Sequence, residues 1–129
     1  MQTLLDAVGL TQWVETEAQI DDITAISGSG PAYVFYLTEC LAQAGCQIGL
    51  PEDVARRIAR ATVEGAGALM AQNPSLTPET LRQNVTSPKG TTQAALEVLM
   101  ETGDTGLAAL LKRAVDAAKQ RSQDLNQSS

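Results

Sequence analysis

A short polar segment, residues 84–93, gathers the residues best suited to chemistry. Gly90 lets the chain turn without a side chain in the way, and Thr91 and Thr92 follow where a helix is expected to begin. Unpaired N–H groups at a helix N-terminus attract anions, and the hydroxyl groups of both threonines and of Ser87 add hydrogen-bond donors. The segment predicts a site for a small carboxylate or phosphate. An ordinary capped loop is the alternative.

A second polar segment, Ile26–Tyr33, has a Gly-x-Gly pattern at Gly28 and Gly30. This spacing invites comparison with dinucleotide-binding loops, but the third glycine is absent and no firm strand precedes the segment. Pro31 suits the first position of a helix, because its missing N–H costs nothing there. The preferred interpretation is a tight turn that leads into a helix, with a nucleotide loop as the alternative.

The titratable residues exclude several kinds of catalysis. The chain has no histidine and two cysteines, so Ser-His-Asp and Cys-His catalysis and histidine-containing zinc sites are excluded within one chain. We predict no metal site. Glu15 and Glu17 flank Thr16, so in a strand both carboxylates would face the same side. A solvated edge is the default interpretation of this pair.

Helical periodicity organises the chain from Ser27 onward. Apolar residues recur three and four positions apart, and Thr77 with Pro78 forms a typical helix start. The predicted helices cover residues 31–44, 51–69, a short stretch from 78, residues 90–100 and residues 107–125. Five helices in about a hundred residues predict an all-α bundle.

The first sixteen residues differ from the rest. Met1–Val8 resembles the tail of a helix closed by Gly9, and residues 11–16 alternate as in a short strand. A single strand cannot pair its own backbone groups, and we see no partner strand elsewhere in this sequence.

Composition narrows the class of protein. Nine Lys and Arg against fifteen Asp and Glu give the 129 residues a net charge of −6, which argues against binding to nucleic acid. The 43% hydrophobic content is too high for a disordered chain. No apolar run approaches the roughly 20 residues of a membrane span, and no export leader opens the sequence. We expect a cytoplasmic globular domain that contacts neither nucleic acid nor membrane.

Small residues and broad apolar faces predict an oligomer. Several predicted helices are apolar around more of their circumference than one small bundle can bury. Ala61 and Gly65 lie one turn apart in the second helix, which would allow another helix to approach closely. That contact could be made within one subunit or between two.

Two motifs in the same order and spacing connect the chain to a known family. Ile26–Tyr33 (Ile-Ser-Gly-Ser-Gly-Pro-Ala-Tyr) and Val85–Thr92 (Val-Thr-Ser-Pro-Lys-Gly-Thr-Thr) resemble motifs in the C-terminal domain of pyrroline-5-carboxylate reductase. The flanking residues 22–25, 49–51 and 81–84 also fit, so the resemblance extends from about Glu15 to Leu125. Helical domains of 6-phosphogluconate and 3-hydroxyacid dehydrogenases fit less well.

The resemblance implies a function and its residues. Members of the family reduce 1-pyrroline-5-carboxylate to L-proline with NADPH or NADH, the last step of proline biosynthesis, and their helical domains interlock as homodimers that can assemble into decamers. By resemblance, the substrate carboxylate would be held by Ser87, Gly90, Thr91 and Thr92. Thr92 would also be catalytic, as a proton relay to the ring nitrogen. Asn84 would contact the cofactor and Glu17 the substrate.

Two departures from the family are visible. Lys89 replaces the first glycine that usually follows Ser-Pro. It would add strain if that position needs a positive φ; if not, its ammonium group could reinforce binding of a carboxylate or phosphate. In addition, no strand with a complete G-x-G-x-x-G motif occurs in this sequence.

We therefore expect a domain rather than a whole enzyme. Residues 1–16 would be the remnant of a nucleotide-binding Rossmann domain, and residues 17–129 the helical dimerisation and substrate-binding domain. Alone, the chain would be inactive and bind neither NADPH nor NADH tightly. A stand-alone helical oligomerisation module without catalysis is the alternative.

Overall fold

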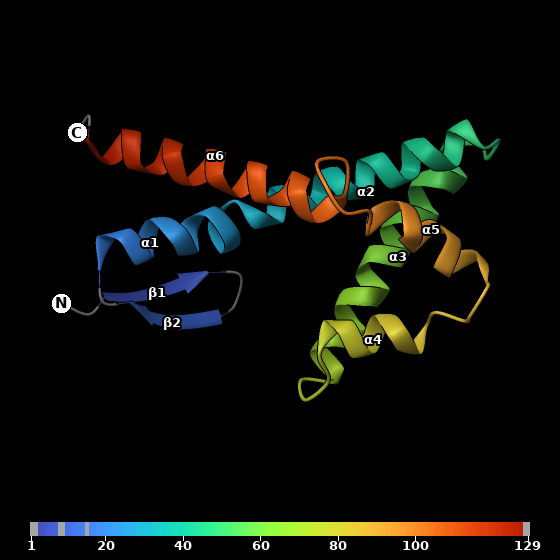
Figure 1. The fold of residues 1–129 in the computed structure, drawn as a ribbon, viewed down its shortest axis with the longest axis horizontal. Coiled ribbons are helices and arrows are strands. Elements are labelled where there is room, and N and C mark those ends of the chain that lie inside the picture. Colours follow the sequence, from blue (N-terminus) through green and yellow to red (C-terminus); the bar gives the residue numbers. More distant parts are fainter. Residues whose placement is uncertain (1–2, 8–9, 15, 128–129) are drawn as a thin grey trace. The chain divides into compact units, whose positions relative to one another are not determined.

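The computed structural model describes residues 3–7, 10–14 and 16–127 of the chain. Its internal contacts divide it into two units, the first made of residues up to Val34 and from Glu101 onward, the second running from Phe35 to Met100. Figure 1 shows the helices and strands of each unit. None of the helices described is both long enough and apolar enough to cross a membrane.

The first unit begins with a hairpin. Strands β1 (Thr3–Ala7) and β2 (Leu10–Val14) pair antiparallel, with Ala7 opposite Leu10. The strand prediction for residues 11–16 is confirmed up to Val14. The helix prediction is wrong over residues 3–7, while residues 1, 2 and 8 lie outside the described part of the chain. The expectation of a strand without a partner is also wrong. A glycine after a short apolar run is typical of helix ends and of hairpin turns alike, and five residues are too few to decide by periodicity.

A helix that the sequence analysis missed follows the hairpin. In α1 (Glu17–Ile23), Thr16 is the N-cap, and its Oγ1 accepts the backbone N–H of Gln19 at 3.2 Å. The placement of Glu17 in a strand is therefore wrong, because it occupies the first helical turn, where an acid is favoured by the helix dipole. A π-helical turn, η1 (Thr24–Gly28), continues α1, and Ser29 donates its N–H to the carbonyl of Thr24 at 2.9 Å.

The segment compared with a dinucleotide loop is thus helical. It comprises the end of η1 and the start of α2 (Gly30–Gln47), with Pro31 in the first turn as expected. The hydroxyl group of Tyr33 donates to the carbonyl of Ala25 at 2.6 Å and ties the two elements together. Because α1 rather than a strand precedes the segment, the strand–loop–helix arrangement of a dinucleotide site is not formed here.

Helix α6 (Leu107–Gln127) packs along α1 and η1 within the first unit (Figure 1). Asp21 is buried at this contact, and its Oδ1 accepts hydrogen bonds from Ser122 Oγ at 2.6 Å and Asn126 Nδ2 at 3.0 Å. Beside it, Lys119 Nζ lies 2.7 Å from Asp22 Oδ1. The hydrogen bond to that carboxylate, followed by its charge, raises the pKa of Lys119 above its ordinary value.

The second unit is built on a pair of helices, α2 and α3 (Glu52–Gln72). Gly49 connects them with a φ of 114°, which only glycine adopts easily. Gly45, expected to end the first helix, lies inside it instead: a Cβ at Gly45 would meet the Cβ of Ala55 at 3.2 Å, so the glycine permits close packing. Ala55 and Ala59 form the small buried part of this unit.

Two shorter helices complete the second unit: α4 (Pro78–Asn84) and α5 (Thr91–Leu99). The predicted start of α4 is confirmed, since Thr77 Oγ1 accepts the N–H of Thr80 at 3.1 Å. The other predicted helices are confirmed with shifts of a few residues at their ends. From Glu17 to Gln127 the helices are the only regular elements described, so this part of the chain is all-α, as expected.

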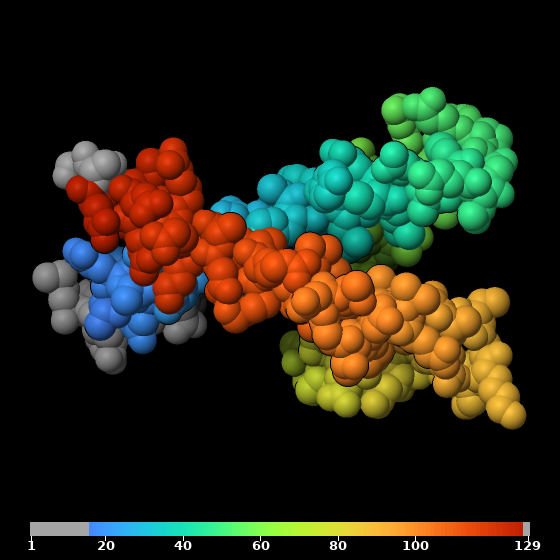
Figure 2. All heavy atoms as spheres, turned by 45° about the horizontal axis from the view of Figure 1, so that its top comes forward, coloured from blue at the N-terminus to red at the C-terminus, as the bar shows by residue number. Residues whose placement is uncertain are grey.

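Most large apolar side chains remain exposed on this chain. Within the described residues, the buried apolar side chains are Ala25, Ala55 and Ala59, whereas Phe35 on α2 and Val98 on α5 are each 68% exposed. The side chains of α2 lie at the surface along the helix in Figure 2. Patches of this kind are typical of surfaces that bind another protein chain.

No packing contact among the described residues accounts for the glycine at position 65 of α3. A Cβ at Gly65 would meet no atom within 4 Å. Of the two alternatives for this position, a tight contact within one subunit is therefore not found among the described residues.

Candidate functional site

The predicted anion site is a turn that leads into α5. Gly90 donates its N–H to the carbonyl of Ser87 at 3.1 Å, and Lys89 has a φ of 61°. Proline at the second position and a positive φ at the third are the marks of a type II turn. The position occupied by Lys89 thus does require the left-handed region, so lysine here carries strain that glycine would avoid.

Gly90 is the N-cap residue of α5, and its backbone is extended. A side chain would be crowded here, since a Cβ would lie 3.2 Å from the carbonyl oxygen of Ser87. Ser, Thr or Asp at an N-cap usually consumes one N–H of the first helical turn, but no side chain caps this helix. The N-terminal amides of α5 therefore stay free of a side-chain cap, next to the exposed Thr91 and Thr92.

Gln93 is a residue that the sequence analysis did not single out. Its Oε1 accepts the backbone N–H of Lys89. It stands at the third helical position, from which Gln or Glu commonly reaches back to the backbone before the helix. The spacing of three residues between Gly90 and Gln93 could have indicated this contact. The capping box, however, is normally recognised by Ser or Thr at the N-cap.

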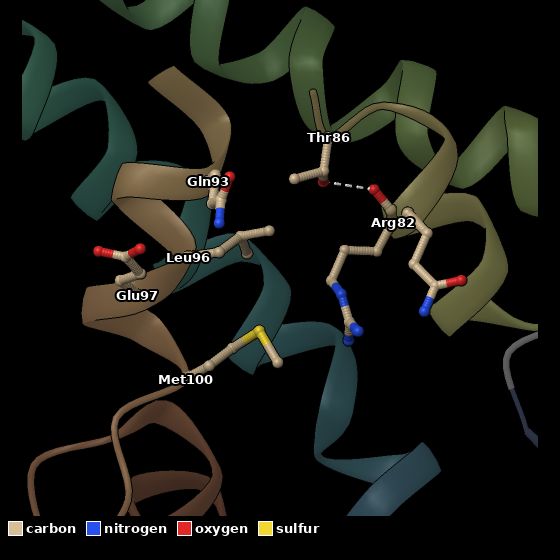
Figure 3. Close-up of a pocket in the computed structure, with 7 residues that line it drawn as sticks. Arg82, Thr86, Gln93, Leu96, Glu97 and Met100 are labelled. Atoms are coloured by element: carbon tan, nitrogen blue, oxygen red, sulfur yellow. Dashed lines mark hydrogen bonds between the residues drawn. The ribbon is translucent and has the colours of Figure 1, made fainter. Parts of the chain in front are cut away.

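A cavity of about 400 Å³ lies between α4 and α5. Figure 3 shows Arg82 and Thr86 on one side and Gln93, Leu96 and Met100 on the other. Thr86 Oγ1 donates to the carbonyl of Arg82 at 2.6 Å. Arg82, which no sequence pattern singled out, is a half-buried residue of α4 that lines the same cavity.

The structure brings together part of the predicted set. Ser87 and Gly90 share a turn, and Thr91 and Thr92 begin the helix that follows it. Asn84 is the last residue of α4, exposed, three positions before the turn. Glu17 begins α1, which belongs to the first unit, whereas the other predicted site residues belong to the second unit.

Comparisons with known proteins point in one direction. Residues 17–125 match the family model described as pyrroline-5-carboxylate reductase dimerisation. The chain is 46% identical over 122 residues to a pyrroline-5-carboxylate reductase of Pseudomonas aeruginosa, covering 95% of the chain and 43% of that protein. Against the enzyme of the same name from Pasteurella multocida the identity is 45%, covering 96% of the chain and 44% of that protein.

Solved structures agree. The structure of a pyrroline-5-carboxylate reductase from Coxiella burnetii matches 87% of the chain and 40% of its own, with a TM-score of 0.76 and 44% identity. The Plasmodium falciparum pyrroline carboxylate reductase, solved with NADP bound, matches 85% of the chain and 40% of its own, with a TM-score of 0.74 and 31% identity. The chain thus spans less than half the length of the relatives it matches.

Proposed function

This chain belongs to the pyrroline-5-carboxylate reductase dimerisation family, and we propose that it is the dimerising and substrate-binding part of an enzyme that reduces 1-pyrroline-5-carboxylate to L-proline with NADPH or NADH. The observation that carries the proposal is the start of α5, where the amides lack a side-chain cap behind the turn of Ser87 and Gly90. A helix N-terminus of this kind suits the carboxylate that substrate and product share.

The proposed chemistry assigns each residue a task. The turn and the first amides of α5 would hold the carboxylate and orient the ring, and orientation of the reacting atoms supplies much of such a reaction. Hydride addition to the protonated imine would leave the ring nitrogen as a neutral amine, and the Thr92 hydroxyl would relay a proton from solvent to that amine. Glu17 would favour the cationic form of the imine. Its side chain is exposed at the start of α1.

Among the described residues, Asn84 could contact a cofactor, but no dinucleotide-binding unit is formed. A reduced nicotinamide supplies the hydride in this chemistry, and the exposed amide of Asn84 can hydrogen-bond to such a group. However, β1 and β2 pair with each other as a hairpin and do not form the strand–loop–helix unit that cradles a pyrophosphate. We therefore assign this chain the substrate end of the reaction and expect no tight cofactor binding by it alone.

The homodimer and the cytoplasmic location are parts of the same proposal. Exposed apolar side chains on α2, α3 and α5 supply material for an interface with a second copy, and larger assemblies of dimers are compatible with it. A helical oligomerisation module without catalysis would use the same surfaces, but it would have no need of uncapped amides behind a glycine N-cap.

Titration of the isotopically labelled chain with L-proline tests the carboxylate site by NMR. We expect the backbone amides of Thr91 and Thr92 to shift, and L-prolinamide, which lacks the carboxylate, to leave them unchanged. Thr92→Val, which removes only the hydroxyl group, should weaken binding, whereas Thr105→Val on an exposed loop should not. If L-proline shifts no amide of α5, the substrate-binding role is refuted and the non-catalytic module is favoured.

A further inference from the structure

A hydrogen bond between Lys89 and Gln93 stabilises the backbone of the proposed substrate loop. Lys89 holds a left-handed backbone with φ of 61° although it carries a Cβ. Such a conformation persists only where the surroundings stabilise it. In the described residues, the side-chain contact at the Lys89 backbone is the hydrogen bond from its N–H to Oε1 of Gln93.

Gln93 reaches this N–H from inside the helix. It is the third residue of α5, half-buried beside the cavity, and its side chain turns back past Gly90 to the turn. The Gly90 N–H is already donated to Ser87. The two hydrogen bonds thus hold the backbone N–H groups of both Lys89 and Gly90. Neither bond uses an N–H of the first turn of α5.

We infer that Gln93 is a positioning residue for the carboxylate site: its Oε1 holds the strained Lys89 backbone, so that the amides of Thr91 and Thr92 stay aimed at the substrate. The inference rests on the function proposed above. It is specific to a loop with lysine at position 89, because a glycine there adopts a positive φ without help. Gln93 itself acts through the turn and need not touch the substrate.

A double-mutant cycle tests the inference on the intact chain. We expect Gln93→Ala to weaken L-proline binding about fivefold to tenfold, within the range that coupled neighbouring residues produce. In the Lys89→Gly background, the same substitution should change the affinity less than about twofold, because neighbours decouple once the strain is gone. Gln83→Ala is the matched control: Gln83 also lines the cavity but bonds to Glu79 at 3.4 Å, away from the turn.

Amide hydrogen exchange at Lys89 provides a readout that does not depend on ligand. Gln93→Ala should accelerate exchange at this amide about tenfold or more, while Gln83→Ala leaves it unchanged, since exchange reports local opening. Unchanged exchange at Lys89, or equal loss of L-proline affinity in both backgrounds, overturns the inference. Wild-type chain that binds no L-proline refutes the proposed function instead, and these two failures are distinguishable because exchange is measured without L-proline. If Gln93→Ala loses its helical circular dichroism, Gln93→Met replaces it, because it keeps the length of the side chain, lacks the acceptor and should accelerate exchange in the same way.

Discussion

Ser122 of α6 donates its hydroxyl hydrogen to the buried carboxylate of Asp21 of α1 at 2.6 Å, joining two helices through residues 101 positions apart in the sequence. Asn126 donates to the same oxygen at 3.0 Å. A buried carboxylate is expensive unless it accepts hydrogen bonds, so this pair of donors specifies how α6 lies on α1.

Asp21→Ala tests this contact. We expect the free energy of unfolding to fall by about 2 kcal/mol, because hydrogen bonds to a charged group are lost and Ser122 loses its acceptor. Urea unfolding at fixed protein concentration measures the change. Asp22→Ala removes only the partly exposed ion pair with Lys119 and should cost less than about 1 kcal/mol. Equal losses in the two variants would contradict a special role for Asp21.

Lys89→Gly should stabilise the chain. A left-handed conformation costs a residue with a Cβ about 1–2 kcal/mol, and the greater freedom of glycine in the unfolded state offsets about 0.5–1 kcal/mol of the gain. We therefore expect a net gain of about 0.5–1 kcal/mol in the same unfolding experiment. Lys89→Ala removes the charge but keeps the Cβ, so it should bring no gain. A gain in that variant would assign the effect to charge rather than to φ.

Local sequence signals predicted the helix starts and turns that depend on residues a few positions apart. Thr77 and Pro78 marked the start of α4 because capping depends on residues a few positions apart, and the turn before Thr91 followed from proline and glycine chemistry. The sequence shows that Lys89 replaces a glycine, but whether this position needs a positive φ is answered only by the observed value of 61°.

The misses have a different cause. The hydrogen bond between Asp21 and Ser122 joins residues 101 positions apart, a pairing that no local pattern encodes. The hairpin partner of β2 has a local signal, a glycine after a short apolar run, but that signal fits a helix end equally well. Helix α1 has a local signal at Thr16 with Glu17 after it, but the same residues also fit an alternating strand edge. Gln93 escaped notice because the residue at its N-cap is a glycine, which has no side chain to complete the usual motif.

Gly65 should report on the contact between two copies. Its position in α3 is open among the residues that the structure describes, so the monomer should tolerate Gly65→Leu, whereas an interface there would be overpacked, at about 1–3 kcal/mol. We expect self-association measured by sedimentation to weaken about tenfold or more. Gly67→Leu is the matched control, because that position is equally open but points to a different side of the helix. Association unchanged in both variants would place the interface elsewhere.

Gly106 immediately precedes α6 and is buried. A Cβ there would lie 1.9 Å from the carbonyl oxygen of Glu101, which is backbone and cannot rotate aside. The same glycine accepts the N–H of Leu110 at 3.2 Å, the first hydrogen bond of the helix.

Gly106→Ala must therefore displace either the loop or the start of α6, and we expect a loss of about 2 kcal/mol or more, as for other overpacked buried sites. Thermal unfolding followed by circular dichroism measures it. Gly67→Ala is the control, since an added Cβ at this position inside α3 meets nothing within 4 Å among the described residues, and a helix interior favours alanine over glycine. A melting temperature for Gly106→Ala at or above that of Gly67→Ala would contradict this prediction and show that the loop from Glu101 can move aside without loss of stability.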